Sequence, residues 1–159
     1  MHPPDEIERR RAACQAAILR AFDEDLDAVR AALLAAADAT RLDGDRPENR
    51  GERGALSSQG ALAGALAARL ERLTADRAAV AALRPGPRLR PGVGAFVEAE
   101  SEDGGLATWW IAPGASGQRL LPDVLAVSPS APIGRSWLAA EIGDSVVIGP
   151  RTWTVVAFR

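Results

Sequence analysis

The sequence predicts an α+β protein, in which an N-terminal antiparallel helical (coiled-coil) hairpin precedes a small antiparallel-sheet domain with one short helix. Three observations support this fold class. The first 83 residues are dominated by Ala, Leu, Arg and acidic residues, most of which favour helix. A run rich in Pro and Gly follows at residues 84–92. All the tryptophans, and all the phenylalanines except Phe22, come after that run.

The first expected helix runs from about Asp5 to Leu42, a stretch without Gly or Pro. Its apolar residues recur every three or four positions, which places on one helix face Ile18, Phe22, Leu26, Val29 and Leu33. A continuous helix of this length would be roughly 55 Å long. The acidic cluster at residues 23–27 interrupts the apolar pattern, so a break in the helix stays open.

The second expected helix runs from Ala55 to about Leu83. A spacing near 3.5 residues relates Leu66, Leu70, Leu73 and Val80, with Arg77 in the register position between the last two. Residues 43–54, between the two helices, are rich in turn formers. The simplest packing is an antiparallel hairpin, and the alternative is a fragment of a larger helix bundle. We predict the hairpin because the connection is short.

Two further expectations concern these helices. Arg9, Arg10 and Arg11 stand beside Glu6 and Glu8, a pattern more typical of a solvated helix face than of an RNA-binding patch. Gly51 and Gly54 loosen the start of the second helix, since each costs up to about 1 kcal/mol relative to alanine.

Residues 84–92 cannot form helix, because three prolines fall within seven positions. We therefore predict a linker there. It would separate a helical hairpin at residues 1–83, with an acidic end near 43–54, from a C-terminal domain at residues 93–159.

The C-terminal domain is expected to contain five strands and one helix. Two hairpins are predicted, one joined through residues 102–105 and one around residues 149–151. The expected strands are Gly94–Glu100, Leu106–Ile111, Val124–Val127, Ser145–Ile148 and Thr152–Phe158, and the expected helix is Pro132–Ala140. The four tryptophans fit the core of so small a domain better than a ligand cage.

Composition excludes several classes of function. The formal net charge of -2 and the isoelectric point near 5.5 argue against coating nucleic acid through bulk charge. His2 is the only histidine and Cys14 the only cysteine, which excludes a Ser-His-Asp triad, a His/Cys metal cage and a disulfide framework. A metal would have to be a hard ion on carboxylates. Without a signal peptide or an apolar run of 18 residues, we expect a cytoplasmic protein with no membrane partner.

Residues 44–49 (Gly-Asp-Arg-Pro-Glu-Asn) carry the most informative motif. Asp45 and Glu48 lie three positions apart, at the expected bend of the hairpin. Two carboxylates are an adequate contribution to a Mg²⁺ site, because this ion keeps several of its waters. The same spacing fits a capping box, with Asp45 as the N-cap and Glu48 at position N3. The residues alone leave both interpretations open.

This arrangement resembles the Gre transcript cleavage factors of bacterial RNA polymerase. Residues 44–49 are similar to the family's Gly-Asp-Leu-Lys-Glu-Asn, and residues 59–60 stand in register with its Gln-Gly. Arg41 matches a basic residue four positions before the family's tip aspartate. Residues 127–135 are similar to its Ile-Ser-x-x-Ser-Pro-(Ile/Leu)-(Ala/Gly)-Arg, and residues 141–148 to its Val-Gly-Asp-x-Val-x-Val strand entry. The resemblance spans about residues 28–159.

The resemblance implies an FKBP-like C-terminal domain that docks on the rim of the polymerase secondary channel, with docking residues Pro132, Ile133, Gly134 and Arg135. The hairpin would reach into the channel, where the catalytic carboxylates Asp45 and Glu48 would help hold the second Mg²⁺ of the polymerase. The nascent RNA 3′ end of a backtracked complex would be contacted by Arg41, Arg46, Arg50 and Arg53. The polymerase would cleave its own RNA. The chain would therefore be a monomeric accessory factor, not an enzyme, and would need no cofactor beyond the shared Mg²⁺.

Three residues depart from the family's pattern. Glu52 stands where the family has an aromatic residue, and Leu56 where it often has a basic one. Ala131 replaces the serine before Pro132, which removes a helix N-cap worth about 1 kcal/mol. The departures at Glu52 and Leu56 keep an alternative open, a channel-binding regulator that modulates or blocks the polymerase without promoting cleavage. A third hypothesis, prolyl isomerisation by the C-terminal domain, rests only on the implied fold and the four tryptophans, and a fold does not imply a function.

Overall fold

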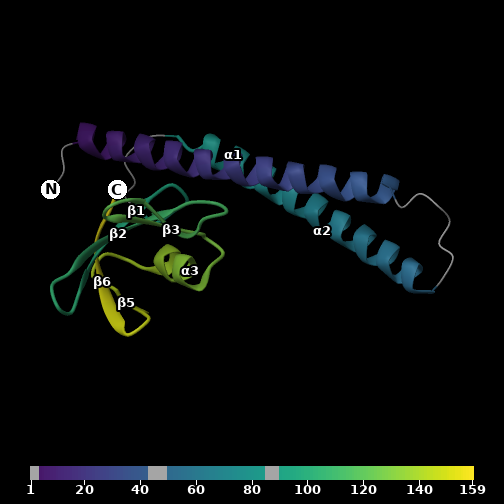
Figure 1. The fold of residues 1–159 in the computed structure, drawn as a ribbon. Coiled ribbons are helices and arrows are strands. Elements are labelled where there is room, and N and C mark those ends of the chain that lie inside the picture. The colour runs from purple at the N-terminus through teal and green to yellow at the C-terminus, as the bar shows by residue number, and fades with distance from the viewer. Residues whose placement is uncertain (1–3, 43–49, 85–89) are drawn as a thin grey trace. The chain divides into compact units, whose positions relative to one another are not determined.

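The computed structural model describes residues 4–42, 50–84 and 90–159. The chain divides into two compact units, one made of Met1–Leu19 with Arg77–Arg159 and the other of Arg20–Asp76. The element order is two long helices, four strands, a short helix and two final strands (Figure 1). The predicted α+β class is therefore confirmed. No helix within the described ranges is long and apolar enough to cross a membrane.

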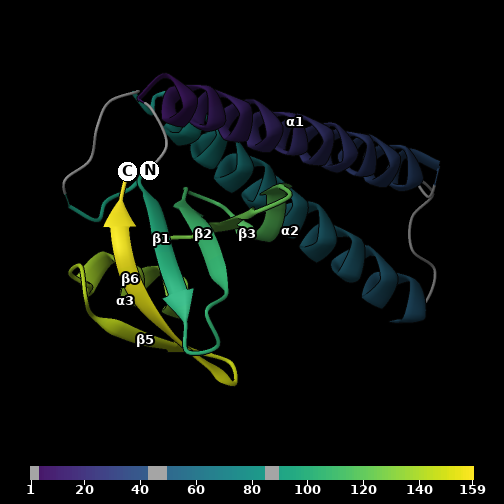
Figure 2. The ribbon, with the colours of Figure 1, turned by 90° about the vertical axis from the view of Figure 1, so that its left-hand side faces the viewer.

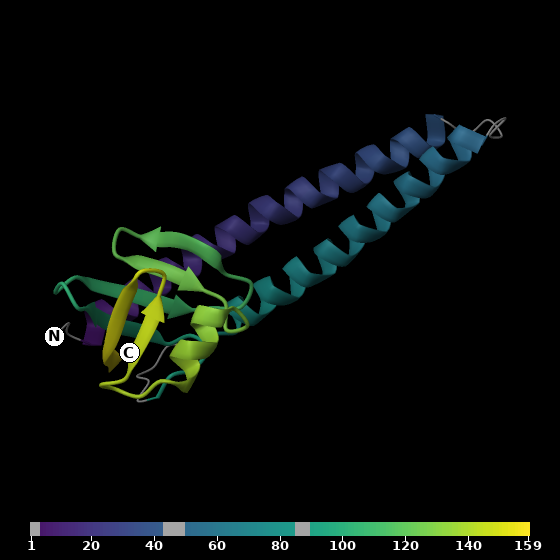
Figure 3. The same ribbon diagram turned by 90° about the horizontal axis from the view of Figure 1, so that it is seen from below.

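The unit Arg20–Asp76 is built from two antiparallel helices, α1 (Pro4–Leu42) and α2 (Arg50–Ala81), as Figures 1 and 3 both show. Helix α1 continues without a break through the acidic cluster at residues 23–27. Its buried face carries Phe22, Leu26 and Val29 at the predicted spacing. Leu66, Leu70 and Leu73 form a half-buried stripe along α2. Helix α2 begins five residues before the expected start, and so includes Gly51 and Gly54.

The other unit contains a six-stranded sheet in the order β3-β4-β2-β1-β6-β5. Its strands are β1 (Phe96–Ser101), β2 (Leu106–Ile111), β3 (Ser116–Leu121), β4 (Val124–Val127), β5 (Ser145–Ile148) and β6 (Arg151–Phe158). Figure 2 shows β6, β1 and β2 side by side. Both predicted hairpins, β1–β2 and β5–β6, are present.

Strand β3 was not expected. It lies at the edge of the sheet, pairs with β4 through two register shifts, and contains Gly117 at φ 83°. Such a strand has little alternation of polar and apolar residues, so its sequence resembles a loop. Because β3 pairs antiparallel with β4, the chain re-enters the sheet with β4 parallel to β2. The expectation of a wholly antiparallel sheet is therefore wrong for this one pair.

The tryptophans fill the core of the sheet unit, as predicted. Trp109 lies 4.9 Å, centroid to centroid, from both Trp137 of helix α3 (Pro132–Ala139) and Trp153 of β6. Trp137 is fully buried and Trp153 half-buried. Successive strand residues point to opposite faces, so Trp110 lies on the other face of the sheet, 6.3 Å from Phe96. Its indole N–H donates to the carbonyl of Gly94 at 3.2 Å.

The first turns of α1 belong to this same unit and pack on the second face of the sheet. The Arg11 guanidinium lies 5.9 Å from the centroid of the Phe96 ring, and its side chain is almost fully buried. Arg10 forms an ion pair with Asp123 at 2.6 Å. The expectation of a solvated arginine face is therefore wrong for these two residues, whose long stems cover an apolar surface while their charges find partners. Arg9 does stay exposed beside Glu6.

Candidate functional site

The motif at residues 44–49, called the tip motif below, lies between α1 and α2 in the sequence. Helix α1 ends at Leu42 and α2 begins at Arg50, so residues 44–49, with Asp45, Arg46 and Glu48, fall outside the described residues. Arg41 stands in the last turn of α1, and Arg50 and Arg53 in the first turn of α2. Three of the four predicted RNA-contacting arginines therefore belong to the helix ends that flank the motif in the sequence. Whether Asp45 and Glu48 bind a metal or cap a helix stays a prediction.

In the described part of the chain, no group of three or more His, Cys, Asp or Glu side chains could hold a metal ion. Asp45 and Glu48 are the residues on which the predicted Mg²⁺ contact depends.

The predicted docking residues occupy the loop after β4 and the first turn of α3. A Cβ at Gly134 would lie 1.9 Å from the carbonyl oxygen of Ser128. Because the loop backbone passes this close, the position has no room for a side chain and requires glycine. Ile133 is half-buried and packs against the core. These two residues therefore shape the turn. Pro132 and Arg135 are exposed and available to a partner.

Hydrogen bonds hold this turn in place. The Arg135 guanidinium donates to the carbonyl of Ser130, and the Arg135 amide donates to the carbonyl of Ala131 at 2.9 Å. The hydroxyls of Ser128 and Ser130 lie 2.8 Å apart. Ala131 occupies the N-cap of α3 and provides no side-chain hydrogen bond, as the sequence predicted. Arg135 therefore braces the loop in addition to presenting its charge.

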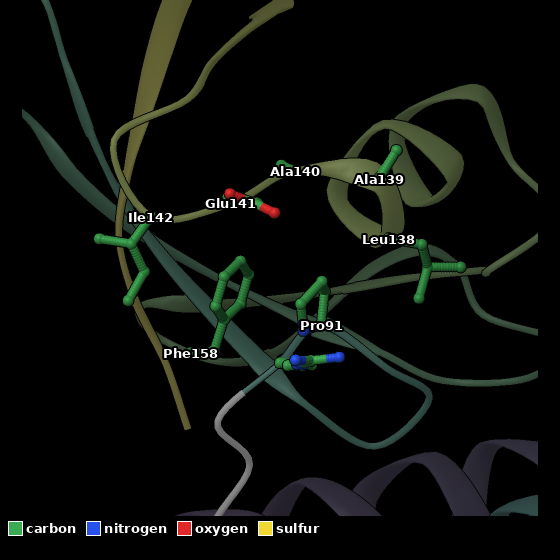
Figure 4. Close-up of a pocket in the computed structure, with 8 residues that line it drawn as sticks. Pro91, Leu138, Ala139, Ala140, Glu141, Ile142 and Phe158 are labelled. Carbon is green, nitrogen blue, oxygen red and sulfur yellow. The ribbon is translucent and has the colours of Figure 1, made fainter.

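The C-terminal end of α3 borders an open hollow of about 570 Å³, which sequence analysis did not identify (Figure 4). Its apolar walls come from three segments remote in sequence and are formed mainly by Pro91, Leu138, Ile142 and Phe158. Arg90 and Glu141 add one charge of each sign. The residues converge only through the fold, so no local motif could have indicated the hollow.

Among the residues that the structure describes, Cys14 and Asp103 have shifted pKa values, and both are remote in sequence from residues 44–49 and from the docking turn. Burial raises the pKa of the Cys14 thiol to about 11, although nearby Arg10 opposes the shift. Cys14 therefore remains a protonated, fully buried small side chain at neutral pH. The pKa of Asp103 is lowered, first by the hydrogen bond from the Ser101 hydroxyl and then by the charge of Arg151. Both groups have a structural explanation, and neither points to catalysis.

No protein-family model matches the chain, and no curated protein matches it. Among solved structures, the chain is similar to the transcription factor Gfh1, with 21% identity over 89% of this chain and 93% of that one, at a TM-score of 0.38. GreA factor homolog 1 (Gfh1) of Thermus thermophilus gives 19% identity over 89% and 94%, at 0.39. Gfh1 of Thermus aquaticus gives 20% over 87% and 92%, at 0.37.

Proposed function

We propose that the chain is a Gre-type transcription elongation factor. It binds RNA polymerase, inserts the end of its helical hairpin into the secondary channel, and stimulates Mg²⁺-dependent cleavage of backtracked RNA by the polymerase. The observation that carries the proposal is the position of residues 44–49 in the connection between α1 and α2. The shorter helix, α2, has 32 residues and is therefore about 48 Å long. A motif that precedes its first residue would lie about that far from its last residue, Ala81.

The chemical role proposed for Asp45 and Glu48 is limited to binding a metal ion. In two-metal hydrolysis of a phosphodiester, one ion activates water and the other stabilises the leaving oxygen. Asp45 and Glu48 would contribute carboxylate oxygens to one of these ions, whose other ligands come from the polymerase. The factor supplies no nucleophile of its own, and the reaction remains that of the polymerase.

The arginines near the tip would hold the RNA. Arg41, Arg46, Arg50 and Arg53 lie within eight positions of the two acids, and guanidinium groups bind phosphate oxygens through paired hydrogen bonds. Their positive charges also offset the repulsion that Asp45 and Glu48 exert on the RNA backbone.

The sheet domain would provide the attachment to the polymerase. Pro132 and Arg135 stand exposed at the start of α3, whereas Gly134 and Ile133 fix the shape of that turn. The proposal therefore assigns direct contact to the first pair and support to the second.

A second function is favoured by two sequence departures. Glu52 and Leu56 take the place of an aromatic and a basic residue beside the tip, which removes a stacking contact and a positive charge from the RNA side. A factor that enters the channel without gripping RNA would regulate or block the polymerase and would not promote cleavage.

Cleavage of a defined backtracked elongation complex separates the two functions. We expect the wild-type chain to accelerate cleavage, and Asp45→Ala or Glu48→Ala to abolish the acceleration while binding persists. Asp25→Ala, an exposed acid on α1 far in sequence from the tip, is the matched control and should act like wild type. Binding without acceleration by the wild type would favour the regulator. Absence of binding to purified polymerase would contradict both functions.

A further inference from the structure

The two edges of the six-stranded sheet differ in how they are protected. Strand β3, at one edge, pairs with β4 through two register shifts and contains Gly117 at φ 83° and Arg119. Irregular backbone and charged side chains of this kind discourage a further strand from pairing. Strand β5, at the other edge, pairs with β6 without a shift and has the uncharged sequence Ser-Val-Val-Ile (Figure 2). The four residues of β5 therefore lack the protection that β3 has.

The ladder between β5 and β6 shows which backbone groups of β5 point outward. The Val155 amide donates to the carbonyl of Asp144 at 2.9 Å, one residue before β5 begins. Antiparallel pairs alternate between bonded and non-bonded, so Ser145 and Val147 stand in pairs that do not bond to β6. The hydroxyls of Ser145 and Thr154 lie 3.1 Å apart, which fits the closer spacing of a non-bonded pair. The N–H and C=O groups of Ser145 and Val147 therefore point toward the open side of β5.

Val147 also exposes an apolar side chain beside these backbone groups. Its exposed fraction is 72%, whereas Val146 and Ile148 on the opposite face are half-buried against the core. Within the described residues, no backbone hydrogen bond joins Ser145 or Val147 to a segment other than β6. An uncharged edge strand with open backbone groups and an exposed aliphatic side chain is a template for pairing with another strand.

A second copy of the chain complements this edge. When two β5 strands pair antiparallel about a two-fold axis normal to the sheet, residues opposite one another face the same side. A residue on that axis must have outward-pointing backbone groups, and Val147 is the apolar residue of β5 that has them. Val147 of each copy then lies opposite Val147 of the other. The two residues bury their side chains together and exchange both backbone hydrogen bonds.

Charges at the two ends of the strand favour the same arrangement. Asp144 precedes β5, and Arg151 follows the turn that ends it. With Val147 on the axis, Asp144 of one copy comes beside the turn that carries Arg151 of the other, at both ends of the interface. Arg151 is 57% exposed and its ion pair with Asp103 is long, at 3.6 Å, so its guanidinium has donors left for a second carboxylate. This charge complementarity favours a second copy over an unrelated extended peptide.

We propose that the β5 edge is a self-association surface, through which two copies of the chain pair antiparallel with Val147 on the two-fold axis. The paired edge is only four residues long, so the interface is smaller than that of a stable dimer and the association is weak. The expected monomer is then the form at low concentration, and the dimer forms as the concentration rises. The inference does not depend on polymerase binding or on transcript cleavage.

Sedimentation equilibrium of the full chain, from roughly 10 µM to 1 mM, tests the association. We expect the mass to rise from 16.7 kDa toward twice that value, with a Kd on the order of 100 µM. Val147→Lys places two like charges on the axis and should raise Kd at least about tenfold. Leu106→Lys is the matched control, because Leu106 is 76% exposed on β2, an interior strand of the sheet, and its Kd should stay within about twofold of wild type. Circular dichroism and the melting temperature would confirm that each variant is folded.

Amide hydrogen exchange, followed by nuclear magnetic resonance, locates the contact. The Val147 N–H bonds to the second copy in the dimer, so its exchange should slow as the concentration rises. The Val146 N–H belongs to a bonded pair with β6 and serves as the internal reference, whose exchange should not change. A chain that stays monomeric at the highest concentration would overturn the inference. A dimer that Val147→Lys leaves intact, or in which the Val147 amide exchanges at the monomer's rate, would overturn it as well.

Discussion

Replacing Gly134 with alanine is expected to destabilise the sheet unit strongly. The residue is buried in the first turn of α3, and an added Cβ would lie 1.9 Å from the carbonyl oxygen of Ser128 and 3.1 Å from the Cα of Pro129. Both atoms belong to the backbone, so neither can rotate away as the end of a side chain would. The new methyl group must displace either α3 or the loop before it.

The magnitude follows from the closeness of that contact. Inserting a methyl group into a packed region typically costs roughly 1–3 kcal/mol. A contact of 1.9 Å with backbone is far inside van der Waals separation, so we expect about 3 kcal/mol or more. Helix α3 also carries the fully buried Trp137, and any shift of the helix loosens the packing against Trp109. For a chain of this size the loss corresponds to a melting temperature about 6–12 °C lower.

Urea unfolding followed by tryptophan fluorescence would measure this loss. Gly64→Ala is the matched control, because Gly64 is exposed on α2 and an added Cβ would meet no atom within 4 Å. Alanine is the better helix former, so this control should be neutral or more stable by up to about 1 kcal/mol. A Gly134→Ala midpoint equal to that of wild type would refute the reasoning. An equal loss in both variants would mean that the contact with Ser128 is not the cause.

Three other outcomes are expected. A double-mutant cycle with Arg10→Ala and Asp123→Ala should give a coupling energy of about 0.5–1 kcal/mol that falls in 1 M salt, because the Asp123 side chain is 60% exposed. The pKa of Asp103 in the folded protein lies below its ordinary value of 3.8. The ionised carboxylate therefore stabilises the fold fully above pH 3.8, and this stabilisation is lost as the pH falls from 3.8 through the lower folded pKa. Asp103→Asn should therefore flatten the acid limb of a stability curve. Because the pKa of Cys14 rises from 9.0 to about 11, stability should fall as pH rises through that interval, and Cys14→Ala should remove that alkaline loss. A thiol reagent at pH 8 should label Cys14 only after unfolding.

The helices could be predicted from sequence because their signals are local and repeated. Ile18, Phe22, Leu26 and Val29 mark one face over about three turns, and the structure buries all four. The start of α2 was placed too late, since Gly51 and Gly54 each reduce helix propensity but do not forbid helix. Favourable packing of the rest of the helix outweighs a penalty of about 1 kcal/mol at each glycine.

The missed features depend on distant partners. Strand β3 pairs only with β4 and does so irregularly, so its six residues carry no clear alternation. The local sequence predicts that Arg10 and Arg11 face solvent, because their contacts are distant in the chain. Arg10 pairs with Asp123 and Arg11 lies over Phe96, and both partners are more than 80 positions away. The linker at residues 84–92 stays a prediction. The start of α1 belongs to the same compact unit as the sheet, a grouping that depends on contacts between residues distant in sequence.

The docking motif illustrates why a match of residues does not assign a role to each of them. Gly134 and Ile133 belong to the motif, yet the structure explains both through packing within the chain. Loss of polymerase binding in Gly134→Ala would therefore be uninformative about contact, because the turn itself would move. Pro132 and Arg135 are the exposed members, and Arg135 also braces the carbonyl of Ser130. Lysine can keep both the charge and a donor at this position but loses the planar fork. Arg135→Lys with unchanged stability and weaker polymerase binding would therefore separate recognition by the guanidinium from support of the loop.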